Sequence, residues 1–148
     1  MGDRGHREMI DRFIQSVPHD IGAMREVCHD DFVQEFPQSG ERFEGLQNLY
    51  DSHQHFPGGN PGVNKDVRRV SGSEDKYVMT PSFTILRITG TGDVYTVENL
   101  GDYPDGSKWH VVSIVEFRGD KISKSTAYFA QPFDAPEWRA KWVKRAKD

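Results

Sequence analysis

The 148-residue sequence lacks several features that would each narrow its function. Its single cysteine, Cys28, rules out a disulfide within the chain and favours a reducing compartment. No apolar run approaches the length of a membrane span, and residues 1–10 are charged, unlike a secretory signal. The formal net charge of −4 argues against a nucleic-acid surface. We therefore expect a cytoplasmic protein that binds neither membranes nor nucleic acid.

Patterns for metals and phosphate-bearing cofactors are also missing. His53 and His55 are two residues apart, and on a helix such positions do not share a face. Gly58, Gly59 and Gly62 are not followed by the Lys-Ser/Thr of a phosphate loop. We expect no metal and no cofactor.

Apolar residues at helical spacing predict three helices in the N-terminal third. The first covers residues 4–17 and ends at Pro18. The second begins at the N-cap Asp20 and carries Cys28 on its apolar face. The third begins after Gly45 and repeats the same spacing.

Beyond the third helix the pattern changes to strands separated by Gly, Asp and Pro turns. With one earlier strand, the predicted strands are 32–36, 67–70, 77–88, 94–103, 109–117 and 121–129. The segment 109–117 is nearly continuous in Val, Ile and aromatic residues, which predicts a central strand covered on both faces. Asp134 and Glu137 form a capping-box pattern, so we expect a C-terminal helix with Trp138 and Trp142 on one face.

This order of elements predicts a single α+β domain over residues 1–148. Short pieces resemble the nuclear transport factor 2-like superfamily, in particular its SnoaL-like (polyketide cyclase-like) branch: Asp30-Asp31-Phe32, Gly45 opening the third helix, and an ending that runs from Lys121-Ile122 to Ala127-Tyr128-Phe129. The resemblance covers nearly the whole chain. It implies a cone of three N-terminal helices packed on a curved antiparallel sheet, plus a C-terminal helix, around a pocket for a small, mostly apolar molecule.

The resemblance also implies where catalytic groups would lie, and those positions are apolar in this sequence. The general base of ketosteroid isomerases corresponds to Phe36, and their tyrosine in the first helix corresponds to Phe13. The last-strand aspartate of SnoaL-like cyclases and limonene-type epoxide hydrolases corresponds to Ala127. Neither a phenyl ring nor a methyl group can transfer a proton, so these mechanisms are absent as written.

Periodicity predicts which side chains line the pocket. If Ala127 faces it, alternation along the last strand places Ser125 and Phe129 on the same face. The expected ligand-binding wall consists of Phe13, Phe36, Leu49, Tyr50, Ser125, Ala127 and Phe129. His110 and His53 are the candidate catalytic residues, because an imidazole exchanges its proton near neutral pH.

Two functions remain open from the sequence. One is a proton-transfer enzyme, namely an isomerase, dehydratase or cyclase, that relies on His110 or His53. The other is a non-catalytic protein that holds a small hydrophobic ligand, which the loss of polar groups at positions 13, 36 and 127 favours. Titratable side chains converging inside one pocket would distinguish the enzyme from the binder.

The sheet predicts a homodimer as well. An antiparallel sheet with helices on one face leaves its other face partly apolar. We expect this open face, with Trp109, Val111, Val115 or their neighbours, to pack against a second copy.

Overall fold

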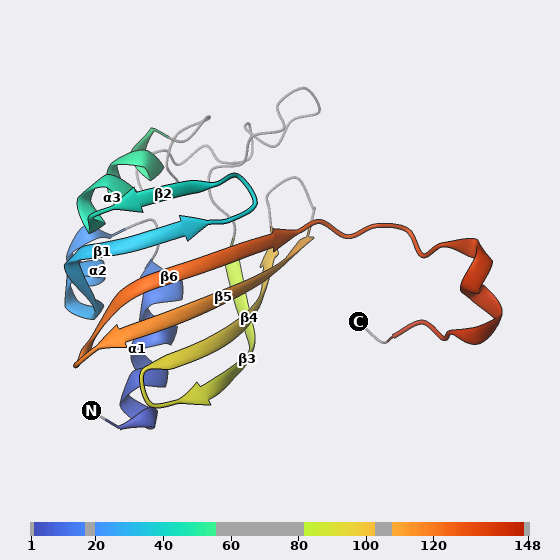
Figure 1. Ribbon diagram of the computed structural model, residues 1–148, viewed down its shortest axis with the longest axis horizontal. Helices are drawn as coiled ribbons and strands as arrows, with labels where there is room; N and C mark the ends of the chain where they lie inside the picture. Colours follow the sequence, from blue (N-terminus) through green and yellow to red (C-terminus); the bar gives the residue numbers. More distant parts are fainter. Residues whose placement is uncertain (1, 17–19, 56–81, 103–107, 147–148) are drawn as a thin grey trace.

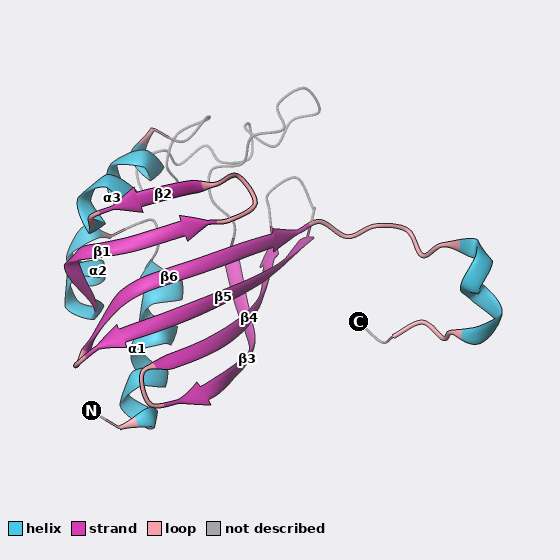
Figure 2. Cartoon of the chain, viewed as in Figure 1, coloured by secondary structure: helices cyan, strands magenta, loops and turns pink. Residues whose placement is uncertain are grey.

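The computed structural model describes residues 2–16, 20–55, 82–102 and 108–146. The helical elements are α1 (Asp3–Ser16), α2 (Ile21–Val27), α3 (Leu46–Gln54) and the 3-10 helix η1 (Glu137–Trp142). The strands are β1 (Cys28–Phe36), β2 (Glu41–Glu44), β3 (Ser82–Thr91), β4 (Val94–Asp102), β5 (Lys108–Arg118) and β6 (Lys121–Ala130). The predicted strand at 67–70, and the start of the one at 77–88, lie outside the described residues. The α+β class is confirmed, with the helices packed on one face of a curved sheet (Figure 1, Figure 2).

The sheet is mixed rather than antiparallel. Its order is β2-β1-β6-β5-β4-β3, and β1 runs parallel to β6 while the other neighbouring pairs are antiparallel. The expectation of an antiparallel sheet is therefore wrong at one pair. The reason is topological: β2, α3 and the strands β3–β5 lie between β1 and β6 in the chain, so the direction of β1 is not set by a hairpin to β6.

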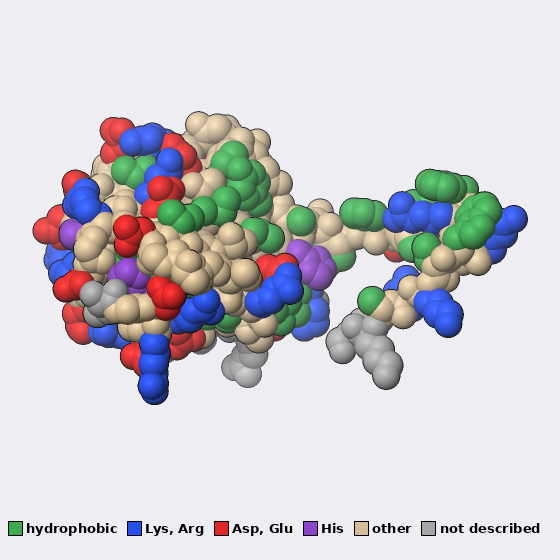
Figure 3. All heavy atoms as spheres, turned by 60° about the horizontal axis from the view of Figure 1, so that its bottom comes forward, with side chains coloured by type: hydrophobic (Ala, Val, Ile, Leu, Met, Phe, Trp, Pro, Cys, Tyr) green, Lys and Arg blue, Asp and Glu red, His purple; other side chains and the backbone are tan. Residues whose placement is uncertain are grey.

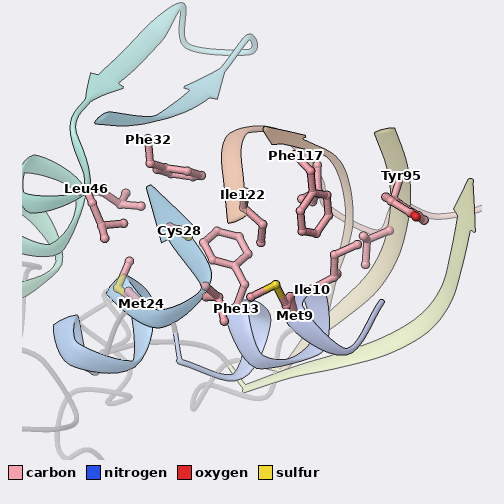
Figure 4. Packing of buried hydrophobic residues seen from close by; sticks show 14 residues of the cluster. Met9, Ile10, Phe13, Met24, Cys28, Phe32, Leu46, Tyr95, Phe117 and Ile122 are labelled. Carbon is pink, nitrogen blue, oxygen red and sulfur yellow. The ribbon is translucent and has the colours of Figure 1, made fainter. Parts of the chain in front are cut away.

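The inner face of the sheet, as we call the face that α1 covers, holds the core. Met9, Ile10 and Phe13 form the apolar stripe of α1, and the rings of Phe13 and Phe32 lie 5.6 Å apart (Figure 4). The Asp20 carboxylate accepts a hydrogen bond of 3.1 Å from the N–H of Ala23, which confirms it as the N-cap of α2.

Cys28 begins β1 and does not lie on α2 as expected. Its side chain is buried in the core, so burial raises the pKa of the thiol far above its ordinary value. A thiol that does not ionise is a poor nucleophile, so Cys28 acts as a core residue and not as a reactive group.

Burial alternates along β5 and identifies the two faces of the sheet. Val111 and Val115 are buried on the inner face, so the expectation that they form the open dimer surface is wrong. Val112 and His110 are exposed on the opposite, outer face. The outer face of β5 is thus partly open in the single chain, and the expected covering of both faces is absent there.

The chain leaves the domain after β6 as an extended arm, residues 131–146 (Figure 1). The arm contains η1, a 3-10 helix of six residues with Pro136 at its N-cap and no side-chain capping bond. The expected capping box of Asp134 and Glu137 is therefore not formed, and no α-helix follows it. None of the described helices has both the length and the apolarity that a membrane span requires.

Candidate functional site

A row of buried polar side chains crosses the inner face. Its members, Gln34, Asn99, Ser113 and Ser125, come from four different strands, and we call them the polar row. Gln34 of β1 lies directly opposite Ser125 of β6. Ser125 and Ser113 are diagonal neighbours, because Ser113 pairs with Ala127. The next diagonal leads to Asn99, which pairs with Val111.

The amide of Asn99 is the least satisfied group of the row. Its Nδ2 lies 3.5 Å from the carbonyl oxygen of Val97, at the limit of a hydrogen bond. Its Oδ1 is buried and has no hydrogen-bond partner among the described residues. Leaving such a group unpaired costs about 1–3 kcal/mol. A buried amide that is not needed to complete the fold is a natural contact for a ligand, and rotation of the amide would present a donor or an acceptor.

Aromatic rings flank one end of the polar row. The ring of Phe36 lies 5.6 Å from the rings of both Phe43 and Phe129, in edge-to-face geometry. All three are only partly buried, unlike the core rings. The row is therefore bordered by apolar surface that a ligand can contact.

The residues beside the polar row on the inner face carry no charge. Within the described strands these neighbours are Phe32, Phe36, Phe43, Ile85, Val97, Gly101, Val111, Val115, Ala127 and Phe129. The site can therefore offer shape, apolar contact and neutral hydrogen bonds, but these residues cannot move a proton.

The structure confirms the predicted register of the last strand. Ser125 and Ala127 are buried, at 2% and 5% exposure, and lie on the inner face. Phe13 and Leu49 are placed deeper, within the hydrophobic core, and Tyr50 packs against that core from α3. The polar row thus contains Ser125 and has Ala127, Phe36 and Phe129 beside it, and the helical members of the predicted wall lie in or against the core.

The two candidate histidines are not brought together. His110 is exposed on the outer face, opposite Leu100 and Ala130, so it lies across the sheet from Ser125. His53 is partly buried on α3, and its Nδ1 lies 2.9 Å from the carbonyl oxygen of Leu49 in its own helix. One pocket on the inner face cannot contain both.

A second polar cluster, which the sequence did not suggest, lies where α1 meets two turns of the sheet. His6 is buried there and stacks on Phe117 with ring centroids 3.9 Å apart. Its two ring nitrogens lie 2.9 Å and 3.2 Å from the carbonyl oxygens of Gly92 and Gly119. Both glycines adopt positive φ, which these tight turns require. We call this region the closed end.

Asp3 and Tyr95 complete the closed end. The Asp3 carboxylate accepts bonds of 2.9 Å from both the Gly92 N–H and the Tyr95 hydroxyl. The Gly92 N–H, and after it the Tyr95 hydroxyl, hold the pKa of Asp3 below its ordinary value. Burial, followed by the bond to Asp3, raises the pKa of Tyr95. Arg7 donates to the carbonyl oxygens of two further residues in β3, Ile88 and Gly90.

Asn99 and Ser113 were missed at the level of sequence, although a signal was present. Each is a polar residue at an inward position of its strand, where the other inward residues are mainly Val and aromatic side chains. His6 gave no such signal, since its partners are backbone atoms far along the chain. Among the described residues, no group of three or more His, Cys, Asp or Glu side chains is placed to hold a metal ion.

Comparisons with known proteins agree with this architecture. The model of the SnoaL-like domain family matches residues 7–125, which is most of the sequence, so the chain belongs to this family. It is similar to the crystal structure of an NTF-2 like protein of unknown function from Burkholderia xenovorans LB400, with 30% identity, a TM-score of 0.73 and 98% of each chain covered. No curated protein matches the sequence.

More distant structures share the fold alone. A putative ketosteroid isomerase from Kribbella flavida DSM 17836 is 16% identical, with a TM-score of 0.73, and the match covers 98% of this chain and 92% of the other. A putative SnoaL-like polyketide cyclase from Jannaschia sp. CCS1 is 13% identical, with a TM-score of 0.61 and 85% of each chain covered. At such identities the comparison establishes the shared fold, whereas function depends on the individual site.

Proposed function

We propose that the inner face binds a small, mostly apolar molecule that carries one neutral hydrogen-bonding group, and that the polar row recognises this group. The buried, unpartnered Oδ1 of Asn99 is the observation that carries the proposal. A ligand that donates a hydrogen bond to Asn99 would remove the cost of the unpaired oxygen. The partly buried rings of Phe36, Phe43 and Phe129 would contact its apolar part.

Binding without proton transfer is the function that the described site supports best. The polar row and its described neighbours on the inner face are uncharged. Ser113 and Ser125 carry hydroxyl groups, but a serine needs an adjacent base before it can act as a nucleophile. A charged ligand would also lose its hydration on this face without gaining an opposite charge.

The alternative hypothesis, a proton-transfer enzyme, depends on His53. This histidine is partly buried on α3, close to Tyr50, which packs against the core. A proton-transfer mechanism at this site would therefore use His53, since His110 lies on the outer face. Its removal would lower a turnover rate by about 10²–10⁴-fold.

Three probes of one shape test the binding proposal: 2-naphthol, naphthalene and 2-naphthoate. We expect 2-naphthol to bind most tightly, because it alone combines an apolar body with a neutral donor. Asn99→Leu should weaken 2-naphthol binding about tenfold, the scale of one buried hydrogen bond, and leave naphthalene unchanged. Binding is measured by the quenching of tryptophan fluorescence or by calorimetry.

Val112→Ala on the outer face is the matched control and should change none of the three affinities. Tightest binding of 2-naphthoate, or an unchanged 2-naphthol affinity in Asn99→Leu, would contradict the proposal. Turnover of a bound compound that is lost in His53→Ala would instead support the enzyme.

A further inference from the structure

The arm exposes an unusual amount of aromatic surface. Phe133, Trp138 and Trp142 are 82%, 74% and 69% exposed, and Val143 is also exposed. Single exposed hydrophobic residues are normal on protein surfaces, but four within eleven residues form a contiguous apolar segment. Hydrophobic side chains and cations alternate along it in Figure 3.

The arm does not pack against the described part of its own domain. Figure 1 shows it projecting away from the end of β6. Its cations lie over its own rings, with Arg139 5.9 Å from the Trp138 centroid and Lys141 4.5 Å from that of Trp142. The described contacts of the arm, including the bond from the Val143 N–H to the Ala140 carbonyl oxygen, stay within the arm. The arm's apolar side chains thus lack the burial that would stabilise them.

A second exposed apolar surface lies on the outer face of the sheet. Val112 and Tyr128 are exposed there and lie directly opposite each other on β5 and β6. Leu100 and Ile114 adjoin them on the same face and are half-buried. These four residues are the outer patch. It spans three neighbouring strands, which makes it a continuous surface rather than isolated side chains.

Charge favours contact between an arm and a domain. Residues 131–148 contain five Lys or Arg against three Asp or Glu, a net charge of +2. The total of −4 therefore leaves −6 on residues 1–130. Domains of this charge repel each other, and a positive arm laid on the neighbouring domain offsets that repulsion.

The surface area that the arm could bury also favours a second copy of this chain as its binding partner. An aromatic side chain buries about 150–250 Å², so the three rings of each arm would bury roughly 900–1,500 Å² in a two-fold pair. Standard stable interfaces bury about 1,200–2,000 Å² in total. The arms alone thus supply most of the area that a dimer needs.

The arm is also part of what this protein shares with the Burkholderia xenovorans structure. That match covers 98% of both chains, which leaves about three of the 148 residues unmatched. It therefore extends through most of the arm and is not limited to the domain.

We propose that the protein is a homodimer with exchanged arms, in which the arm of each copy packs on the outer patch of the other. Trp138 and Trp142 are the anchors, and Val112 and Tyr128 are their receiving surface. The two-fold arrangement makes both contacts identical. The inner face and the polar row stay clear of this interface, since they lie on the opposite side of the sheet.

The test uses the full chain and two double variants. The arm variant carries Trp138→Ser and Trp142→Ser. The patch variant carries Val112→Lys and Tyr128→Glu, whose opposite charges keep the cross-strand pair favourable. By sedimentation equilibrium, we expect each variant to raise the dimer dissociation constant about 100-fold or more, because the arm variant removes two aromatic anchors and the patch variant places charges beneath them. Ala140→Ser, an exposed position of η1, is the matched control and should leave the dimer intact.

Mixing the two variants separates exchange from self-contact. In a mixed dimer, the intact arm of the patch variant meets the intact patch of the arm variant, so one of the two contacts is restored. We expect the mixture to contain more dimer than either variant alone. No recovery on mixing would overturn the exchange, because an arm that folds onto its own domain gains nothing from a partner.

Fluorescence quenching provides a readout on the unaltered protein. Trp138 and Trp142 should be shielded from acrylamide at concentrations where the dimer forms and become accessible on dilution. A protein that remains monomeric at about 100 µM would overturn the proposal. A dimer in which both tryptophans stay fully accessible to acrylamide would overturn it as well.

Discussion

The closed end and the polar row both bury polar side chains beneath the sheet, but the two regions differ in how far those side chains are hydrogen-bonded. At the closed end, the buried His6 ring contacts the carbonyl oxygens of Gly92 and Gly119, and the buried Tyr95 hydroxyl donates to the exposed Asp3 carboxylate. In the polar row, the Oδ1 of Asn99 has no partner among the described residues. Since an unpaired buried group costs stability and a paired one does not, the first region stabilises the fold and the second is available for a ligand.

The partners at the closed end explain this difference. The contacts of His6 join residues 86 and 113 positions apart, so they hold α1, which takes part in no strand pairing, against the turns at Gly92 and Gly119. The residues of the polar row lie on neighbouring strands that backbone hydrogen bonds already hold together. Their side chains are therefore not needed for the register of the sheet.

The largest effect is expected at the closed end. His6→Ala removes the stacking on Phe117 and two buried contacts to carbonyl oxygens, so it should lower the free energy of unfolding by about 3 kcal/mol. Urea denaturation followed by circular dichroism measures this. His55→Ala, at an exposed site, should change stability by less than about 0.5 kcal/mol. Equal effects of the two variants on the free energy of unfolding would contradict a structural role for His6.

A smaller effect of opposite sign is expected in the polar row. Asn99→Leu replaces an unpaired buried amide by an apolar group of similar size, so it should raise the free energy of unfolding by about 1–2 kcal/mol. Asn48→Leu is the contrasting control, because the Asn48 amide donates a 2.7 Å bond to the Glu44 carbonyl. Destabilisation by Asn99→Leu of more than about 1 kcal/mol would show that this amide supports the fold.

The smallest effect is the pH dependence at the closed end. The pKa of Asp3 is lowered from 3.8, first by the Gly92 N–H and then by the Tyr95 hydroxyl. A lowered pKa means that the carboxylate stabilises the fold above pH 3.8 and that this contribution is lost as the pH falls through the folded-state value. The stability gap between wild type and Asp3→Asn should therefore be present at neutral pH and shrink as the pH falls below about 4.

Paired denaturation curves at neutral and acidic pH measure that gap. Asp11→Asn, an exposed position of the same helix, serves as the control. A gap for Asp3→Asn that does not change with pH would mean that the charge of the carboxylate plays no part.

The local elements were largely predictable. The stripe of Met9, Ile10 and Phe13 has the period of a helix, and Asp20 is a short acceptor placed to cap the next one. Alternation placed Ser125 and Ala127 on the buried face, and the structure confirms it. Such patterns depend on neighbours within a few residues, which is the range that a sequence reports directly.

The predictions that failed depended on distant partners. Alternation on β5 separated His110 from Val111, but it could not say which side α1 covers, so the residues expected on the open face lie on the covered one. The capping pattern at Asp134 predicted a helix, yet a helix this short gains most of its stability from packing, and the arm has no domain surface beneath it.

From the amino-acid sequence alone, the class of fold, the positions of most helices and strands, and the apolar character of positions 13, 36 and 127 could be predicted. The parallel pairing of β1 with β6, the position of Asn99 beside the two serines, and the contacts of His6 with two turns became visible only in the folded chain. Local periodicity is encoded in adjacent residues, whereas these contacts arise when the curved sheet brings distant segments together. The partners of a buried polar group can be identified only once that sheet has formed.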